Sequence, residues 1–238
     1  MENIIYKNNV EIVISRYNED LLWLNEYPFN QFEYIIYNKG DNDNFNKTNV
    51  KKIVKLPNVG RCDHTYLYHI CENYDNLSDI VVFFPGSVNI KEKKNKAINI
   101  LTNIIKKNYK ETYFVGNYCN SVKEHFKSFK INYHKCADSR NFNKNNETKL
   151  FKCKIRPYGK WYEYFFKNTQ ARWYTFSGVF SIDKRDIIQH SIERYMILKN
   201  VVGLHSNPEV GHYIERSWGA IFYPLIHTNK VCLNTKMA

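Results

Sequence analysis

Ionisable side chains are concentrated near the end of the sequence, in residues 207–218. His212, Glu215 and Arg216 are spaced i, i+3 and i+4, so on a helix they share one face. A carboxylate whose pKa is raised in such a cluster can serve as a general base. We therefore predict that Glu215 is a catalytic base, with Glu209 as the competing candidate. The alternative is a structural helix that carries an ion pair.

A second group of polar residues follows the first predicted strand. Within residues 15–20, Arg16 offers a cation to a phosphate and Tyr17 offers an aromatic face to a nucleotide base. Binding residues are concentrated on loops, which favours a functional role for this segment. The alternative is a polar turn that only caps the next helix.

Residues 57–61, Pro-Asn-Val-Gly-Arg, have the composition of a phosphate-binding loop. Gly60 allows a positive φ or a close approach of the backbone. Arg61 lies at a predicted helix entrance, where free N–H groups favour an anion. We predict phosphate binding here, against the alternative of an ordinary strand-to-helix turn.

The sequence contains no strong metal-binding pattern. Asp41 and Asp43 have the DxD spacing that can hold a divalent cation, but they lie in an Asn/Asp-rich segment typical of turns. Residues 85–89, which follow the most apolar strand, include no carboxylate. No two cysteines have CxxC spacing. We predict no metal ligands among the site residues and reduced cysteines.

Alternating strand and helix patterns predict one α/β domain. Apolar or β-branched runs predict strands at 10–15, 32–37, 52–56, 79–84, 112–115 and 176–182. Amphipathic spacing and capping residues predict helices at 21–24, 64–73, 91–108, 184–198 and 209–222, with Asp63 and Asp183 as N-caps.

This order of elements predicts a mostly parallel central sheet with helices on both faces. Ligands would then bind beyond the carboxyl ends of the strands, an edge that brings together residues 15–16, 38–39, 58–61 and 85–87. Residues 117–160 lack periodicity, and we predict that they form an irregular basic insertion.

The positive charge of the chain is unevenly distributed. The net charge is +12, and residues 91–154 carry 16 basic and 5 acidic side chains. Such a segment suggests an anionic partner, so nucleic-acid binding is an alternative function. A solvated lysine surface is the simpler explanation, because Lys reads bases poorly compared with Arg. The sequence shows neither the ~20-residue apolar run of a membrane span nor a secretory signal, so we expect a cytoplasmic protein.

Three sequence blocks occur in a characteristic order. They are RYNED at residues 16–20, NVGRxxHTYL at 58–67 and GHYIERSW at 211–218. Together they resemble an uncharacterised family, a domain of unknown function of fungi and large DNA viruses. The resemblance extends from about residue 10 to 223, and it is poor over 117–160.

That family is distantly similar to glycosyltransferases with the GT-A fold. The resemblance implies a nucleotide-binding half at 10–116 and an acceptor and catalytic half at 161–223. It implies transfer of a sugar from a UDP- or GDP-sugar to a glycan or protein acceptor, in the cytoplasm of the host cell if the source is viral. Mn²⁺ or Mg²⁺ would be an optional companion of the donor, because the acidic motif expected after Phe84 is missing.

The resemblance also assigns roles to residues. Nucleotide and phosphate contacts fall to Ser15, Arg16, Tyr17, Asn38, Lys39, Asn58, Gly60, Arg61, Arg185 and Arg216. Sugar and acceptor contacts fall to Ser177, Gly178, His212 and Trp218. Glu215 or Glu209 would deprotonate the acceptor, while basic side chains stabilise the departing diphosphate. A third alternative is a non-catalytic module that binds a glycan or a partner through aromatic residues near Trp161 and Trp173.

Overall fold

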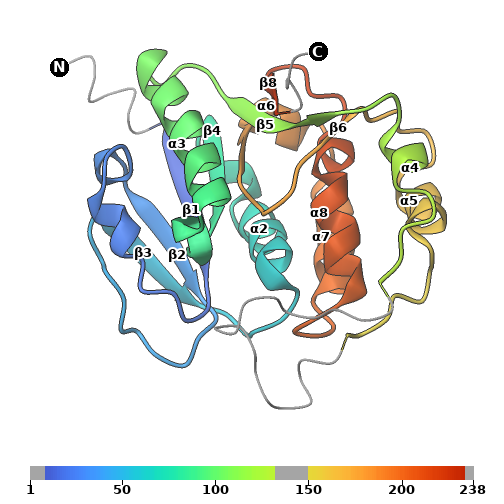
Figure 1. Ribbon diagram of the computed structural model, residues 1–238, viewed down its shortest axis with the longest axis horizontal. Helices are drawn as coiled ribbons and strands as arrows, with labels where there is room; N and C mark the ends of the chain where they lie inside the picture. The colour runs from blue at the N-terminus through green and yellow to red at the C-terminus, as the bar shows by residue number, and fades with distance from the viewer. Residues whose placement is uncertain (1–8, 132–149, 234–238) are drawn as a thin grey trace.

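The protein is described here by a computed structural model covering residues 9–131 and 150–233 (Figure 1). Its main sheet has five strands in the order β3-β2-β1-β4-β7. These are β1 (Val10–Arg16), β2 (Tyr34–Asn38), β3 (Val50–Lys55), β4 (Ile80–Pro85) and β7 (Phe180–Asp183). The first four are parallel and β7 runs antiparallel to β4, so the prediction of a mostly parallel α/β sheet is confirmed.

A smaller sheet continues the main one. It has the order β6-β5-β8 and consists of β5 (Tyr113–Tyr118), β6 (Trp173–Tyr174) and β8 (Asn229–Cys232). The Ser181 hydroxyl of β7 bonds both the N–H and the carbonyl of Tyr113, each at 2.9 Å, and so joins β5 to the main sheet. The sequence pattern missed β8, because two of its four residues are exposed and polar.

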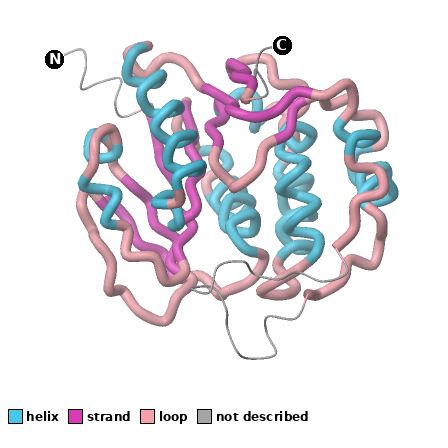
Figure 2. Tube along the Cα trace, in the orientation of Figure 1, coloured by secondary structure: helices cyan, strands magenta, loops and turns pink. Residues whose placement is uncertain are grey.

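Four longer helices accompany the sheet: α2 (Arg61–Glu72), α3 (Lys91–Lys106), α7 (Ile192–Val202) and α8 (Glu209–Ile221). Shorter helices are η1 (Leu22–Asn25), η2 (Phe29–Gln31), η3 (Tyr74–Asn76), η4 (Gly86–Asn89), α4 (Val122–His125), α5 (Tyr158–Phe166) and α6 (Lys184–Ile188). Figure 2 shows α3 on the viewer's side of the main sheet and α2 on the other side. None of the described helices is long and apolar enough to span a bilayer.

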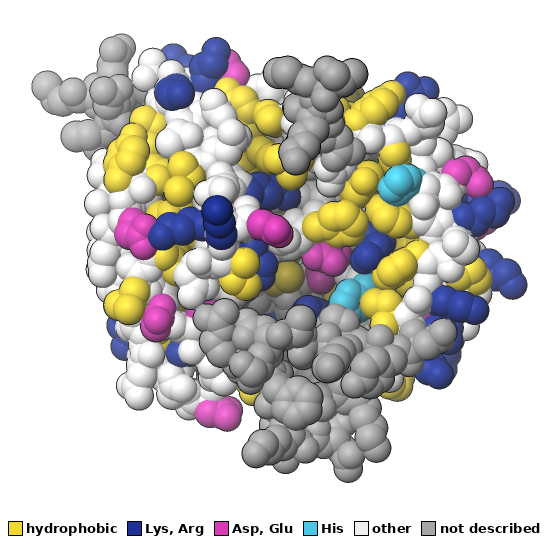
Figure 3. Space-filling view, in the orientation of Figure 1, with side chains coloured by type: hydrophobic (Ala, Val, Ile, Leu, Met, Phe, Trp, Pro, Cys, Tyr) yellow, Lys and Arg dark blue, Asp and Glu magenta, His cyan; other side chains and the backbone are white. Residues whose placement is uncertain are grey.

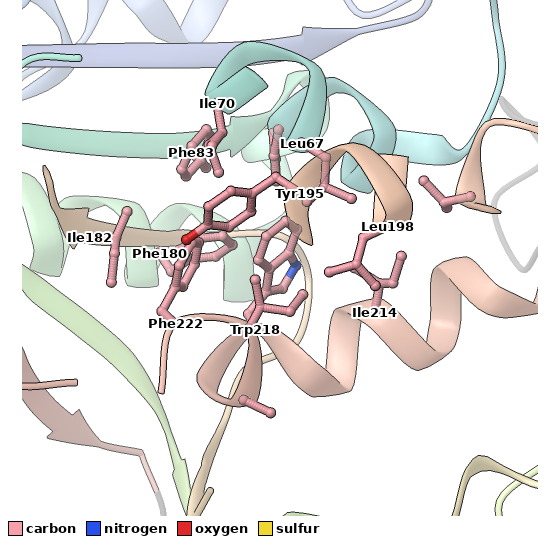
Figure 4. Close-up of a cluster of buried hydrophobic side chains, with 14 of the residues drawn as sticks. Leu67, Ile70, Phe83, Phe180, Ile182, Tyr195, Leu198, Ile214, Trp218 and Phe222 are labelled. Atoms are coloured by element: carbon pink, nitrogen blue, oxygen red, sulfur yellow. The ribbon is translucent and has the colours of Figure 1, made fainter. Parts of the chain in front are cut away.

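Alternating side chains of the inner strands build two hydrophobic cores. In β4, Val81 and Phe83 belong to the core that includes α2, α7 and α8, whereas Val82 and Phe84 belong to the core that includes α3. Successive residues of a strand point to opposite faces, so a strand covered on both sides is apolar throughout. Figure 4 shows the first of these cores, in which Trp218 lies among apolar side chains from several elements.

Two predicted helices differ in their boundaries. The helix predicted at 184–198 is two helices, α6 and α7, although Asp183 caps the first as predicted by accepting the Arg185 N–H at 2.9 Å. The helix predicted to begin at His64 begins at Arg61. Its N-cap is Gly60, with φ of 61°, so Asp63 lies inside the first turn and is not the cap.

The segment predicted to be irregular, 117–160, is partly regular. It contains the end of β5, helix α4 and the start of α5. Its middle part, 132–149, lies outside the described residues.

Helix α8 approaches the small sheet closely at one glycine. A Cβ on Gly219 would lie 1.9 Å from the backbone oxygen of Trp173, a distance that only a backbone shift can relieve. At Gly211 of the same helix, the nearest atom to such a Cβ is 3.5 Å away, an ordinary contact. The two glycines therefore differ in packing but share the same secondary structure.

We expect Gly219→Ala to lower the free energy of unfolding by about 2 kcal/mol or more, because overpacking against backbone outweighs the helix propensity gained. Gly211→Ala is the matched control and should be neutral or stabilising by up to about 1 kcal/mol. Urea denaturation of both variants measures the difference. Equal stabilities would contradict the close approach of α8 to β6.

Candidate active site

Charged side chains from three helices meet beside the turn that precedes β7. We call Arg61, Cys62 and Asp63 of α2, Lys96 of α3 and Glu215 of α8 the central cluster. The negative charge of Glu215 acts to raise the pKa values of Cys62, Asp63 and Lys96. The positive charge of Arg61 acts to lower the pKa values of the two residues that follow it, Cys62 and Asp63. Figure 3 shows acidic and basic side chains side by side around a hollow near the middle of this face, between α3 and α8.

The turn before β7 is strained and firmly held. Ser177 and Gly178 have φ values of 71° and 64°, and the first of these costs an L-residue roughly 1–3 kcal/mol. The Ser177 N–H donates to Oε1 of Glu215 at 2.7 Å, and the Tyr66 hydroxyl donates to the Gly178 carbonyl at 2.8 Å. A Cβ on Gly178 would lie 2.9 Å from Sγ of Cys62. Such strain, paid for by surrounding contacts, is typical of functional sites.

Glu215 has the geometry of a positioned base. Its side chain is 25% exposed, and the Ser177 N–H fixes Oε1. Oε2 lies 3.8 Å from Nη1 of Arg216, too long for a hydrogen bond. One oxygen is thus anchored while the other can accept a proton from a ligand.

Asp63 is a second carboxyl group of the site, which the sequence did not reveal. Its side chain is buried, and Oδ1 accepts a hydrogen bond from Nε1 of Trp218 at 3.0 Å. Burial, followed by the negative charge of Glu215, raises the pKa of Asp63 to about 7. Its position after Gly60-Arg61 indicated only a helix cap, because sequence alone did not show that α8 packs over it.

Lys96 is a buried amine that faces the same carboxylate. Its Nζ donates to the Thr175 hydroxyl and, at 3.2 Å, to the Phe176 carbonyl, so it holds the residues before the turn. Burial lowers the pKa of Lys96 to about 7, although Glu215 opposes this shift. A signal existed in the sequence: Lys96 precedes Ile100 by four residues and so lies on the apolar face of α3.

Cys62 is unsuited to nucleophilic catalysis. Burial and the charges of Asp63 and Glu215 raise the pKa of its thiol to about 12. The thiolate is the nucleophilic form, so Cys62 stays unreactive near neutral pH.

Several predicted phosphate ligands do lie near the cluster. Arg61 extends toward His212, with Nη1 and Nε2 at 3.4 Å. Lys39 is buried, and its Nζ donates to the carbonyls of Val59 and Arg61, which shapes the entrance of α2. Burial lowers the pKa of Lys39 to about 8.

Arg16 holds loops together instead of facing a ligand. Its side chain is buried, and its guanidinium donates to Asn38 Oδ1 (2.7 Å), to the Asn42 carbonyl (2.8 Å) and to the Glu19 carbonyl (2.8 Å). It also stacks on Phe45, 4.3 Å from the ring centroid. The Arg16 guanidinium and the Asn38 side chain are therefore both bound to other groups of the chain.

The remaining residues of the first two loops have separate surroundings. Ser15 is buried and bonds the Thr65 hydroxyl at 2.8 Å. Tyr17 is half-buried, and its N–H donates to Oε2 of Glu19. Asn58 is exposed on the loop before α2. None of the three contacts the central cluster through a hydrogen bond of the described residues.

Three other predicted residues are occupied by contacts within the chain. Arg185 forms an ion pair with Asp183 at 2.8 Å. Asp183 is paired with Ile80 at the start of β4, so Arg185 lies at the opposite ends of the strands from the predicted ligand-binding loops. Trp218 is fully buried, so it cannot stack on a sugar. The Arg216 guanidinium stacks on Phe129, 3.7 Å from the ring centroid.

Glu209 is the weaker of the two predicted bases. Its side chain is fully buried, and its carboxylate accepts the N–H groups of Ile131 and Cys153, the Tyr213 hydroxyl and the Arg156 guanidinium, at 2.9–3.1 Å. Four donors occupy the lone pairs of this carboxylate, which thereby joins Ile131 and Cys153 to α8.

The described residues contain no group of three or more His, Cys, Asp or Glu that could hold a metal ion. Asp43 of the DxD pair instead accepts a hydrogen bond from Asn38 Nδ2 at 2.7 Å.

A family model covers residues 12–237, and therefore nearly all of this fold and its cluster. The chain belongs to the DUF3431 family. The family is described as a protein of unknown function, so membership confirms an uncharacterised domain and assigns no activity. No curated protein matches the chain.

We expect Glu209→Gln to lower the free energy of unfolding by about 2 kcal/mol, because an amide cannot accept hydrogen bonds from all four donors and leaves a buried one without a partner. Glu163→Gln is the control, since Glu163 forms an exposed pair with Lys123 and its loss should leave the stability close to that of wild type. Urea titration compares the two. A Glu209→Gln variant as stable as wild type would show that the four donors do not need the charge.

We expect Lys96→Met to remove a pH dependence of stability. The unfolded amine has a pKa of 10.5 and the folded one about 7, so between these values the unfolded state binds more protons and stability rises with pH. Wild type should gain up to about 5 kcal/mol over this range relative to the variant. Denaturation at pH 7, 8.5 and 10 measures the slopes, with Lys91→Met, on the exposed start of α3, as control. Parallel curves for wild type and Lys96→Met would contradict a neutral Lys96.

Proposed function

We propose that the protein transfers a sugar from a nucleotide-sugar donor to a hydroxyl acceptor, and that its fold is a variant of the GT-A fold. The observation that carries the proposal is the central cluster: Glu215, with Oε1 anchored by the Ser177 N–H, shares the surroundings of Cys62 with the cations Arg61 and Lys93. A carboxylate base next to positive charge is what transfer from a diphosphate donor requires.

The sheet order supports a nucleotide site at this edge. In the order β3-β2-β1-β4 the direction of winding reverses between β1 and β4, and open α/β sheets bind ligands at such a switch point. The loops that follow these strands touch each other there. A Cβ on Gly86 would lie 2.7 Å from Oε2 of Glu19 and 3.3 Å from Cα of Arg16.

The reaction assigns a role to each group. The acceptor hydroxyl gives its proton to Glu215 Oε2 while its oxygen forms a bond to the anomeric carbon. The bond from that carbon to the diphosphate oxygen breaks, and the nucleoside diphosphate leaves with the electron pair. Arg61 and Lys93 supply positive charge for the leaving group. Lys93 approaches from α3, where its Nζ donates to Ser87 Oγ at 2.7 Å in the loop after β4.

A divalent metal does not fit the residues of this edge. The loop after β4 has no carboxylate, and the DxD aspartate Asp43 is engaged with Asn38. The proposal therefore includes no step through Mn²⁺ or Mg²⁺ and relies on side-chain cations.

The nucleic-acid alternative receives less support from the described residues. In the basic segment, Lys93 and Lys96 turn toward the cluster, while Lys94 pairs with Glu26 and Lys123 pairs with Glu163. The glycan-binding alternative loses Trp161, which is fully buried, although Trp173 is half-buried at the edge of β6.

We expect UDP, GDP or one of their sugars to raise the melting temperature, because a ligand that binds only the folded state stabilises it by mass action. The shift should persist in EDTA. In Glu215→Gln the shift should remain, while release of nucleoside diphosphate from the donor, with water as acceptor, should fall roughly 100-fold or more.

Glu163→Gln is the matched control and should keep both properties. Turnover at the wild-type rate in Glu215→Gln would remove Glu215 from the role of base. The absence of a shift with every nucleotide would overturn the proposed donor class.

A further inference from the structure

Asp63 of α2 lies against the part of α8 that carries Glu215, because a Cβ on Gly211, four residues before Glu215, would lie 3.8 Å from Oδ2 of Asp63. Glu215 binds the Ser177 N–H, and Cys62, the residue before Asp63, borders Gly178. Asp63 is also bonded to the Trp218 indole, which lies one helical turn after Glu215 on α8. The two carboxyl groups are therefore brought together by the packing of α2 against α8.

The two carboxyl groups have unequal surroundings. Asp63 is 2% exposed, and its hydrogen bond comes from a neutral indole N–H. Glu215 is 25% exposed, accepts a backbone N–H, and lies 3.8 Å from the Arg216 guanidinium. A buried acid beside a like charge retains its proton, whereas the more solvated acid ionises.

We propose that Asp63 and Glu215 form a coupled carboxyl pair that holds one proton, carried by Asp63, so that Glu215 alone bears the negative charge. Coupled acids of this kind titrate as a unit. The pair differs from an ion pair, because its function depends on keeping one member neutral.

Several charged or titratable groups face this pair. They are Arg61, Cys62 and Tyr66 from α2, Lys39 after β2, Lys93 and Lys96 from α3, and His212 and Arg216 from α8. Arg61 and Lys39 favour an ionised Asp63, but burial and the charge of Glu215 outweigh them and raise the pKa of Asp63 to about 7.

The consequence for catalysis rests on the proposed function. With Asp63 neutral, an anionic diphosphate donor faces one carboxylate. Above neutral pH the ionised Asp63 adds a second negative charge, which repels the donor and weakens its binding. Asp63 is thus a positioning residue that acts through the charge of the site.

The test is a carboxyl ¹³C NMR titration of the ligand-free protein, with the Asp63 signal identified by its loss in Asp63→Asn. We expect a midpoint within one unit of pH 7 in wild type and a midpoint at least one unit lower in Glu215→Gln. The Trp218 indole N–H signal, observed without altering Asp63, should follow the same midpoint. This second reading keeps the test valid if Asp63→Asn does not fold.

Glu163→Gln is the control and should leave both signals unchanged. A wild-type midpoint below 5 would overturn the proposal, and so would a midpoint unmoved by Glu215→Gln, because burial alone would then hold the proton. In donor hydrolysis, KM should rise through the same pH range in wild type and stay flat in Asp63→Asn. If the protein binds no nucleotide, the proposed function fails while the titration still decides the carboxyl pair.

Discussion

The buried Trp218 indole connects the hydrophobic core to the polar site. Its ring packs against Phe180 of β7 and Phe222 at the end of α8, with centroids 5.0 and 5.5 Å apart (Figure 4). Its N–H binds Asp63. Because a buried indole needs a partner for its N–H, the packing of α8 and the position of Asp63 cannot be separated. The site is built into the core and is not a surface addition to it.

Several groups at the centre of the molecule lower its stability, and surrounding contacts hold them in place. Ser177 has an unfavourable backbone conformation, and Lys96 and Asp63 are buried with pKa values shifted toward neutrality. Each feature opposes folding, and the charge of Glu215, which binds the Ser177 N–H, acts on both Lys96 and Asp63. Local conflicts of this kind are concentrated at functional sites, where the rest of the fold compensates for them.

Several charged residues that the sequence offers as ligand-binding or catalytic candidates instead pair with other groups of the chain. Arg16 joins the loops that follow β1 and β2, Glu209 accepts from four donors, and Arg185 pairs with Asp183 at the opposite ends of the strands. Buried charges need such partners, and a sequence does not show whether the partner is a ligand or the chain itself. The same limit applies to Asp63 and Lys96: Asp63 follows the predicted phosphate loop and Lys96 lies on the apolar face of a predicted helix, but neither pattern shows that both side chains lie near Glu215.

The sequence alone determined most of the strand and helix order, and hence the mostly parallel sheet, because apolar periodicity and helix signals are local. It also singled out His212 and Glu215, whose shared helix face follows from their spacing, and Arg61, although the pattern places the start of that helix at His64. Only the tertiary structure decided which charges meet. The contacts of Glu215 with Ser177 and of Asp63 with Trp218 join residues 38 and 155 positions apart. Burial, which shifts their proton affinities, depends on the packing of α2, α3 and α8, and no local pattern encodes that packing.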